Sequence, residues 1–509
     1  MTTSWFLLLS MFFVACTDID ATAYTAAAYD HARVGRLNDP PNLVVEMNLK
    51  KYIKAGKIAK SKGADIIVYP EYGIFYPGNR TQLKHFLEDV PDPKKTRTAP
   101  CDEVELYMKR PILYTLSCVA KHNAMYVVAN MGDIKDCSGV SECPEDGVFH
   151  FNANIVFDRN GRLILRYYKE HLFFELGMDL AREEQDPVFT TDFGTFATYI
   201  CFDILFKRMS QVAKWPQIDG IMFTSMWAEN PPQGLSVAFW QGWALGNNAT
   251  IVVSNIQSPS RYALGSGIFH KTHGSLGYTY NPDRVSKVVV AKVPVSHQPV
   301  LTSRPSLTAF TDTKVWDMKS EEEDVPKVCS NLLIDATDDS TEKLYCSDEK
   351  TTNYTLVKLP KSGGHVKACN NGMCCSVSYS AETIEEDYYL GVYNGTINAY
   401  DLNRYCWCEE NCFLARCDAI KGRPCSTFPR KTNTVFYHVE LKSNFSTPFV
   451  YPSVVSSKSR LVPMTEWEFD VGHSSDSQSS IHFHSKYGEQ LLSVGFRARC
   501  FDRDPPYVR

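Results

Sequence analysis

Short apolar runs alternate with amphipathic stretches from about Ala32 to Val295. The runs consist almost entirely of apolar side chains, which is typical of strands that are buried on both faces. They occupy residues 66–69, 126–129, 197–200, 220–223, 251–254 and 288–291. Between them, apolar residues recur at helical spacing at 49–63, 111–119 and 235–245. This alternation predicts a layered α/β fold and argues against an all-β one.

The character of the chain changes after about residue 300. Pro299, Pro305 and the acidic run 321–324 are typical of a solvated connection between domains. Eleven of the 17 cysteines lie between 329 and 500, so we expect this part to depend on crosslinks as well as on its core. We therefore divide the chain into a signal peptide at 1–23, an α/β domain at 24–310, a linker at 311–328 and a cysteine-rich, mainly β domain at 329–509.

The N-terminus carries an apolar run of 12 residues, 5–16, which has the length of a signal-peptide core. The run is shorter than the ~20 residues that span a bilayer, and residues 21–23 offer a cleavage site of small residues. A buried N-terminal strand or helix is the alternative. Because no later apolar run is long enough to span and the chain ends in a polar segment, 500–506, we expect neither a membrane span nor a lipid anchor.

Cysteine content and glycosylation motifs also favour export. Seventeen cysteines are too many for a typical reduced cytosolic enzyme. Five N-x-S/T motifs offer candidate glycosylation sites, at Asn79, Asn248, Asn353, Asn394 and Asn444. The four cysteines within 406–417 lack the paired arms of a closed zinc site, so in an oxidising compartment we favour disulfides there. The sequence thus predicts a secreted, extracellular protein.

Cysteine spacing predicts part of the disulfide pattern. Cys137 and Cys143 are close enough in sequence to close a small loop, which predicts a local disulfide. We expect Cys118, on an apolar helical face, and Cys201 to stay reduced. Cys101 and the eleven C-terminal cysteines then remain, and full pairing would require one bridge between the domains.

Charge and motif content exclude several classes of function. The chain has 53 Lys+Arg and 58 Asp+Glu, a formal net charge of −5, without a block of basic residues. A dedicated nucleic-acid surface needs a clustered positive field, so we expect no nucleic-acid partner. The sequence also lacks H-E-x-x-H, G-x-S-x-G, G-K-[ST] and a G-x-G-x-x-G that follows a strand, which disfavours the corresponding metal, serine and nucleotide chemistries.

Three segments each place one reactive residue at the end of an apolar strand. Glu71 follows Val68-Tyr69, Lys169 follows 166–168, and Cys201 follows 198–200. Catalytic groups in α/β folds gather at strand ends, where the backbone is fixed but the loops are open. Alone, each residue has an ordinary reading as a turn residue, a surface lysine or a buried thiol. Together, the carboxylate, the ammonium and the thiol favour one shared site.

At these segments the sequence resembles the vanin and biotinidase branch of the nitrilase, or carbon-nitrogen hydrolase, superfamily. The resemblance covers roughly residues 25–300, including the Gly265-Ser266-Gly267 loop, and continues in the length and cysteine content of the C-terminal part. It implies a nitrilase-like α-β-β-α sandwich followed by the branch's extra domain. It also implies a catalytic triad without metal or cofactor: Glu71 as proton acceptor, Lys169 as oxyanion stabiliser and Cys201 as nucleophile.

The thiol is expected to be activated by its surroundings. If Cys201 lies where a strand turns into the amphipathic stretch 204–213, the helix dipole and the Lys169 charge would both favour the thiolate. The resemblance then implies hydrolysis of a linear amide through an acyl-thioester on Cys201, with release of the amine before the acid.

The branch offers two small-molecule substrates, pantetheine and biotinyl amides such as biocytin. The segment 258–261 is more like the vanin form, which favours pantetheine. Trp227 and Arg261 are candidate substrate contacts, although residues 224–233 depart from the family's usual Pro-Thr-Ala-Trp start, and Trp227 has an alternative role in the core. A secreted binding or adhesion protein that kept the scaffold without turnover is the alternative from another class.

Overall fold

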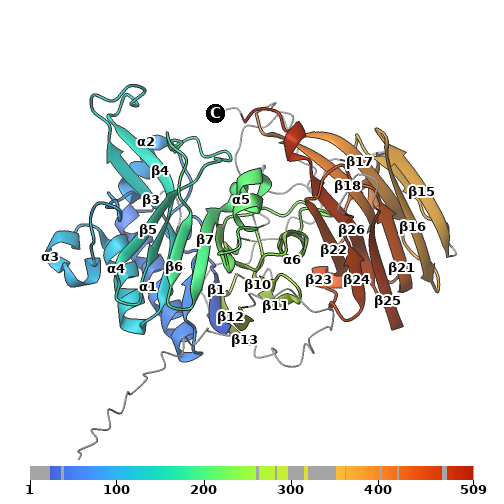
Figure 1. The fold of residues 1–509 in the computed structure, drawn as a ribbon, viewed down its shortest axis with the longest axis horizontal. Coiled ribbons are helices and arrows are strands. Elements are labelled where there is room, and N and C mark those ends of the chain that lie inside the picture. The colour runs from blue at the N-terminus through green and yellow to red at the C-terminus, as the bar shows by residue number, and fades with distance from the viewer. Residues whose placement is uncertain are drawn as a thin grey trace, which may run out of the picture.

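The computed structural model describes residues 23–35, 39–258, 263–280, 284–295, 314–318, 351–361, 363–399, 404–420, 423–472 and 478–507. Residues 1–22 of the predicted signal peptide, most of the predicted linker and the candidate contact Arg261 lie outside these ranges. The described chain forms an α/β domain up to residue 318 and an all-β domain from residue 351 onward, which lie side by side (Figure 1).

The N-terminal domain contains two mixed sheets. The first has seven strands in the order β13-β12-β1-β2-β3-β4-β5. They are β1 (Ala23–Asp30), β2 (Ile66–Val68), β3 (Tyr126–Asp136), β4 (Val148–Phe157), β5 (Leu163–Tyr168), β12 (Ser286–Pro294) and β13 (Lys314–Met318). The second has six strands in the order β11-β10-β9-β8-β7-β6. They are β6 (Val188–Thr191), β7 (Gly194–Ile200), β8 (Gly220–Ser225), β9 (Ile251–Asn255), β10 (Ser266–His270) and β11 (Gly274–Thr279). All six strands predicted from apolar runs are present, and β13 lies within the predicted linker.

The two sheets face each other and helices cover their outer faces. Ala28 and Val68 of the first sheet share a core with Ile221 and Val252 of the second. The long helices are α1 (Pro41–Ser61), α4 (Pro111–Asn123) and α6 (Ser236–Asn247). The short helices and 3-10 turns are α2 (Arg80–Leu83), α3 (Val104–Tyr107), α5 (Lys207–Val212), η1 (Lys84–Phe86), η2 (Pro100–Asp102) and η3 (Cys201–Leu205). Because α1 and α4 pack on the first sheet and α6 on the second, the α-β-β-α sandwich is confirmed.

The predicted helices exist, but their bounds differ. The helix predicted at 49–63 begins at Pro41, whose ring suits the first turn of a helix. The stretch 204–213, predicted as one amphipathic helix, is instead the end of η3 followed by α5. The chain is extended at Phe206, with φ −111° and ψ 152°, and this residue separates the two elements.

The C-terminal domain is built from strands, as expected. One sheet has the order β14-β17-β18-β26-β22-β23, a second β15-β16-β21-β25-β24, and β19 pairs with β20. The strands are β14 (Thr355–Lys358), β15 (Gly364–Asn370), β16 (Met373–Ala381), β17 (Tyr388–Asn398), β18 (Cys406–Arg416), β19 (Asp418–Ile420), β20 (Arg423–Thr427), β21 (Phe436–Ser443), β22 (Val450–Ser456), β23 (Arg460–Leu461), β24 (Trp467–Asp470), β25 (Ser479–Glu489) and β26 (Leu491–Arg499). Val377 and Leu441 of the second sheet meet Leu414 and Val494 of the first in a common core.

Helix α6 joins the two domains. It is buried on all sides. The six-stranded sheet of the N-terminal domain covers one side, and β22 of the C-terminal domain covers the other. A Cβ added to Gly242 would lie 2.5 Å from the carbonyl oxygen of Pro452, and one added to Gly246 would lie 2.1 Å from that of Val450. The absence of side chains at these two positions therefore allows the helix to touch the strand.

One pair of cysteines corrects a prediction. Cys101 and Cys118 form a disulfide, so Cys118 is not reduced and Cys101 is not part of an interdomain bridge. The reason is that η2 packs on α4, where the amide of Cys101 donates to the hydroxyl of Ser117 at 3.0 Å. His122 lies beside this pair, and these three residues are the one group of close potential metal ligands within the described chain. The disulfide leaves no thiolate there to bind a metal.

The other disulfides follow the predicted distribution. Cys137 and Cys143 form the local disulfide that their spacing predicts. Four more crosslink the C-terminal domain: Cys369–Cys374, Cys375–Cys412, Cys408–Cys500 and Cys417–Cys425. Three of the four cysteines within 406–417 are thus in disulfides, which overrules the zinc reading.

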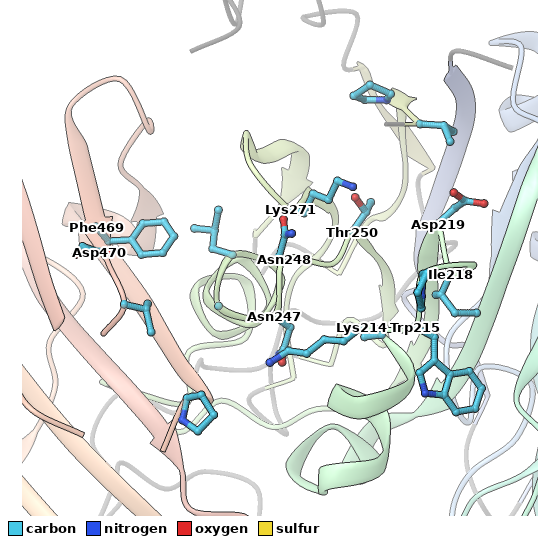
Figure 2. A pocket seen from close by; sticks show the side chains of 18 residues that line it. Lys214, Trp215, Ile218, Asp219, Asn247, Asn248, Thr250, Lys271, Phe469 and Asp470 are labelled. Atoms are coloured by element: carbon cyan, nitrogen blue, oxygen red, sulfur yellow. The ribbon is translucent and has the colours of Figure 1, made fainter. Parts of the chain in front are cut away.

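A cavity of about 810 Å³ lies between the domains (Figure 2). Asp219 and Thr250, which line it, directly precede the parallel strands β8 and β9. Cys201 follows the opposite, C-terminal end of β7, which runs parallel to β8. The cavity is therefore at the other edge of the sheet from the predicted nucleophile, and we do not assign it to the reaction.

Candidate active site

Two of the predicted residues form a buried ion pair. Glu71 follows β2 and Lys169 follows β5, and these strands run in the same direction within the first sheet. Their side chains therefore emerge at the same edge, where Lys169 Nζ lies 2.7 Å from Glu71 Oε1. Both side chains are only 2% exposed. A buried charge needs a partner of this kind, since its hydration is lost.

A second carboxylate, which the sequence did not predict, also pairs with Lys169. Lys169 also donates to Glu175 Oε1. The Asn152 side-chain amide donates to both acids, at 2.8 Å to Glu71 and 2.7 Å to Glu175. The hydroxyl of Tyr72 donates to Glu175 at 2.8 Å. Glu175 lies in an irregular loop after β5, so no strand end or periodicity marked it.

The charges on Lys169 and Glu71 reinforce each other. Burial alone would lower the pKa of Lys169, but the carboxylates of Glu175 and Glu71 raise it well above its ordinary value. Burial raises the pKa of Glu71, while the charge of Lys169 opposes that shift. The lysine is therefore an ammonium throughout the neutral range.

Cys201 completes the predicted set. It follows β7, begins the turn η3 with a φ of +43°, and is a free thiol that is 8% exposed. The charges of Glu71 and Lys169 both act on the thiol, and the thiol in turn acts on Lys169. The amide of Met226 donates to Glu71 Oε2 at 2.9 Å and also hydrogen-bonds the sulfur. All three predicted residues therefore share one site.

The resting state of the thiol differs from our expectation. Burial raises the pKa of Cys201 and the charge of Glu71 raises it further, while Lys169 lowers it. The expected helix dipole is missing, because η3 is a five-residue 3-10 turn and α5 begins only at Lys207. Cys201 is accordingly a protonated thiol, and Glu71 is a carboxyl group beside it that could accept its proton.

Asp203 connects the turn that carries Cys201 to the end of β5, which precedes Lys169. Its Oδ2 accepts hydrogen bonds from the amide of Ile200 at 3.1 Å and from the hydroxyl of Tyr167 at 2.9 Å. Its Oδ1 accepts from the amide of His171 at 3.0 Å. One buried carboxylate thus fixes the ends of β5 and β7 relative to each other.

Trp227 lies beside the site with its polar edge occupied. Its backbone N–H donates to Asn255 at 2.8 Å, and its indole N–H donates to the carbonyl of Gly234 at 3.0 Å. Its ring stacks on Phe239 with centroids 5.3 Å apart. These are contacts of a packed wall residue, so contact with a substrate would use the 8% of its surface that is exposed.

The glycosylation candidates differ in accessibility. Four of the asparagines are exposed: Asn79, Asn248, Asn353 and Asn444. Asn394 is half-buried on β17, where its side-chain nitrogen donates to the carbonyl of Asn371 at 2.9 Å and its oxygen accepts from Arg503 at 3.0 Å.

Among the residues that the structure describes, no helix combines the length and apolar character that a membrane crossing requires.

Comparison with known proteins places the chain. A carbon-nitrogen hydrolase family model matches residues 32–234, and a model of the vanin C-terminal domain matches residues 344–504. Pantetheinase of Mus musculus is 31% identical over 98% of this chain and 94% of its own length. Biotinidase of Bos taurus is 29% identical over 95% of this chain and 93% of its own. A solved amidase from Nesterenkonia sp. is 18% identical with a TM-score of 0.39, over 55% of this chain and 93% of that one. The chain belongs to the carbon-nitrogen hydrolase family, in the branch of vanins and biotinidases.

Proposed function

We propose that this carbon-nitrogen hydrolase cleaves the linear amide of pantetheine to pantothenate and cysteamine, with Cys201 as nucleophile, Glu71 as proton carrier and Lys169 as oxyanion stabiliser. The observation that carries the proposal is a buried Lys169–Glu71 pair whose charges act on a free thiol. The full-length similarity to pantetheinase supports the choice of substrate.

In the first half of the reaction, Glu71 accepts the thiol proton as the sulfur attacks the amide carbonyl. The negative oxygen that forms is bound by Lys169 and by the backbone N–H of Phe202. An ammonium has three N–H donors. Two of those of Lys169 are held by Glu71 and Glu175, which leaves the third for the carbonyl oxygen. Glu71 then gives its proton to the departing amine, and an acyl-thioester remains on Cys201.

In the second half, Glu71 accepts a proton from water, which attacks the thioester carbonyl. The second tetrahedral intermediate collapses, the acid leaves and Cys201 regains its proton from Glu71. Glu175 does not exchange a proton in this scheme. It keeps Lys169 charged and directed, since it shares both Lys169 and Asn152 with Glu71.

The pH dependence should show Glu71 as the base. Its pKa is raised by burial, so kcat/KM should fall on the acid side at a pH above the ordinary carboxyl value of about 4.5, as protonation removes the acceptor. Lys169 remains charged on the alkaline side because its pKa is raised. Measuring kcat/KM for pantetheine from about pH 4 to pH 9 tests this. An acid limb at or below that ordinary value, or one that Glu71→Gln retains, would contradict the assignment.

Substrate choice is tested by amine release from pantetheine and from biocytin. We expect pantetheine to give the higher kcat/KM, with Cys201→Ala as the blank for spontaneous hydrolysis. Biotinidase is the second candidate, because biotinidase of Bos taurus is almost as similar over the same span. Preferential cleavage of biocytin would select it. Turnover of neither compound, nor of simple aliphatic amides, would favour a binding protein on the same scaffold.

We further propose that the protein is a secreted glycoprotein. The six disulfides among the described residues suit an oxidising compartment. The four exposed asparagines are accessible to a glycan, although Asn79 also caps helix α2 through its side-chain oxygen. A glycan on Asn394 would replace the bond from its side-chain nitrogen to Asn371.

A further inference from the structure

The turn that carries Cys201 is held at its far end by the C-terminal domain. The turn η3 ends at Leu205, whose carbonyl oxygen accepts two hydrogen bonds from Arg499 on β26, at 3.0 Å from Nε and 2.7 Å from Nη2. Arg499 is fully buried, with an exposure of 0%. The last carbonyls of a helical turn lack partners within the turn, so an outside donor is required when the turn is buried.

The guanidinium of Arg499 is fixed on its other side. Nη2 and Nη1 donate to the two carboxylate oxygens of Asp504 at 2.8 and 3.2 Å, and Nη1 also donates to the carbonyl of Cys408. Together with the two bonds to Leu205, these use all five N–H groups of the side chain. Asp504 Oδ1 also accepts from the amide of Cys408 at 2.7 Å.

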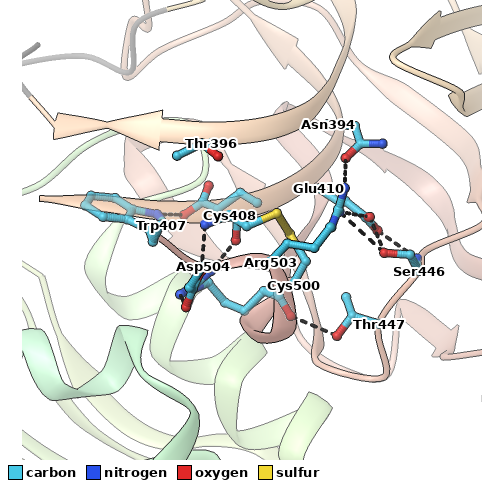
Figure 3. Close-up of a disulfide and its surroundings, with 12 residues drawn as sticks. Asn394, Thr396, Trp407, Cys408, Glu410, Ser446, Thr447, Cys500, Arg503 and Asp504 are labelled. Atoms are coloured by element: carbon cyan, nitrogen blue, oxygen red, sulfur yellow. Dashed lines mark hydrogen bonds and ion pairs between the residues drawn. A yellow bond between two sulfur atoms is a disulfide. The ribbon is translucent and has the colours of Figure 1, made fainter. Parts of the chain in front are cut away.

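A disulfide closes this arrangement. Cys500 directly follows Arg499 and is bonded to Cys408 on β18 (Figure 3). The backbone next to Arg499 is thus crosslinked to β18. Asp504, the carboxylate partner of Arg499, is hydrogen-bonded to the same strand through the amide of Cys408. A lysine could carry the charge, but it lacks the planar fork that reaches Leu205 and Asp504 at once.

The backbone conformation of Cys201 explains why the turn needs the hydrogen bonds from Arg499. A φ of +43° is unfavourable for a residue with a side chain, and such conformations persist where the surroundings hold them. Strand β7 holds the turn on one side, and Arg499 holds it at Leu205 on the other. The C-terminal domain also covers the neighbouring ring of Phe202 with Trp407, at a centroid distance of 5.8 Å.

The same domain holds the loop that carries Glu175. The hydroxyl of Tyr405 accepts from the amide of Phe174 at 2.9 Å, and the hydroxyl of Tyr507 donates to the carbonyl of Leu172 at 2.7 Å. Both segments of the site are therefore bonded to the second domain.

We propose that Arg499 is a positioning residue that, from the C-terminal domain, holds the Cys201 turn in its reactive geometry. This inference rests on the function proposed above. Arg499 touches neither the sulfur nor a substrate in this scheme. It acts through Leu205, so its loss should slow acylation without weakening substrate binding.

The test is Arg499→Met in the full chain. A displacement of about 1 Å at a reacting group costs on the order of 100-fold in rate, so we expect kcat to fall 10- to 100-fold while KM stays within about twofold. The matched control is Arg503→Met, because Arg503 bonds to Asn394 and Glu410 within the C-terminal domain (Figure 3). It should leave kcat unchanged. A folded Arg499→Met protein with the wild-type kcat, or with a change confined to KM, would overturn the proposal.

Two further measurements separate possible failures. The rate of Cys201 alkylation by iodoacetamide should fall in Arg499→Met, and this readout does not depend on any amide being cleaved. If wild-type protein cleaves no amide, the proposed function fails, whereas the alkylation rates still decide the role of Arg499. The double variant Arg499→Met/Asp504→Asn removes the carboxylate that would otherwise lose its partner, and it should show the same slow alkylation and low kcat in folded protein. Wild-type alkylation in that variant would also overturn the proposal.

Discussion

Cys201→Ala is expected to abolish nearly all amide hydrolysis. The sulfur forms the bond to the acyl group, and removal of a nucleophile that works as a unit with its base costs on the order of 10⁶-fold in kcat. The fold should persist, because the change removes one buried atom and no hydrogen bond that links the two domains. Amine release measures the loss. Intact-protein mass spectrometry should show an acyl adduct on the wild-type chain and none on the variant.

The matched control for this variant is Cys406→Ala. Cys406 is the other free cysteine among the described residues, and it is partly exposed at the start of β18. This variant should keep the wild-type rate and the adduct. An adduct that persisted in Cys201→Ala, or that disappeared in Cys406→Ala, would show that the acyl group is carried elsewhere.

Lys169→Met is expected to remove both turnover and part of the stability. Loss of one oxyanion donor costs about 3–4 kcal/mol, or roughly 10²- to 10³-fold in kcat. The same change leaves Glu71 and Glu175 buried without their cation, and breaking a buried pair from one side costs about 3–5 kcal/mol of folding free energy. Activity assays and urea unfolding measure the two effects separately.

A double variant separates these effects. Lys169→Met/Glu175→Gln removes one of the two stranded charges, so it should regain stability while turnover stays low. Lys50→Met is the surface control, since Lys50 is 69% exposed in its pair with Glu46 and such pairs contribute about 0–1 kcal/mol. If the double variant regained turnover together with stability, Lys169 would have a structural role only.

The sequence predicted the parts of the site that local rules control. Continuous apolar runs predict the buried strands. Strand ends make Glu71, Lys169 and Cys201 candidates, and the resemblance to the vanin and biotinidase branch implies their roles. Glu175 was not predicted, because it lies in an irregular loop and its role depends on its contact with Lys169. The resting state of the thiol was also beyond the sequence, because it depends on burial and on the charge of a residue 130 positions away.

The pairing of cysteines failed for a similar reason. The apolar helical face predicts a reduced Cys118, but the element that covers this face is η2, which brings Cys101 onto it. Helix α6 is a second feature that local rules leave open. It is predicted as a helix, but the structure shows that both of its sides are covered, one of them by a domain that is remote in sequence.

The contact of α6 with the second domain has a consequence for biosynthesis. Leu235 and Ala238 pack with Val455 and Leu492, and the glycines of α6 touch β22. When residues 23–295 leave the ribosome, that face of the helix is still bare, and it stays so until β22 and β26 have been translated. The apolar face of α6 and its two glycines therefore stay uncovered during this interval, and the N-terminal domain completes its packing only after the second domain has been translated.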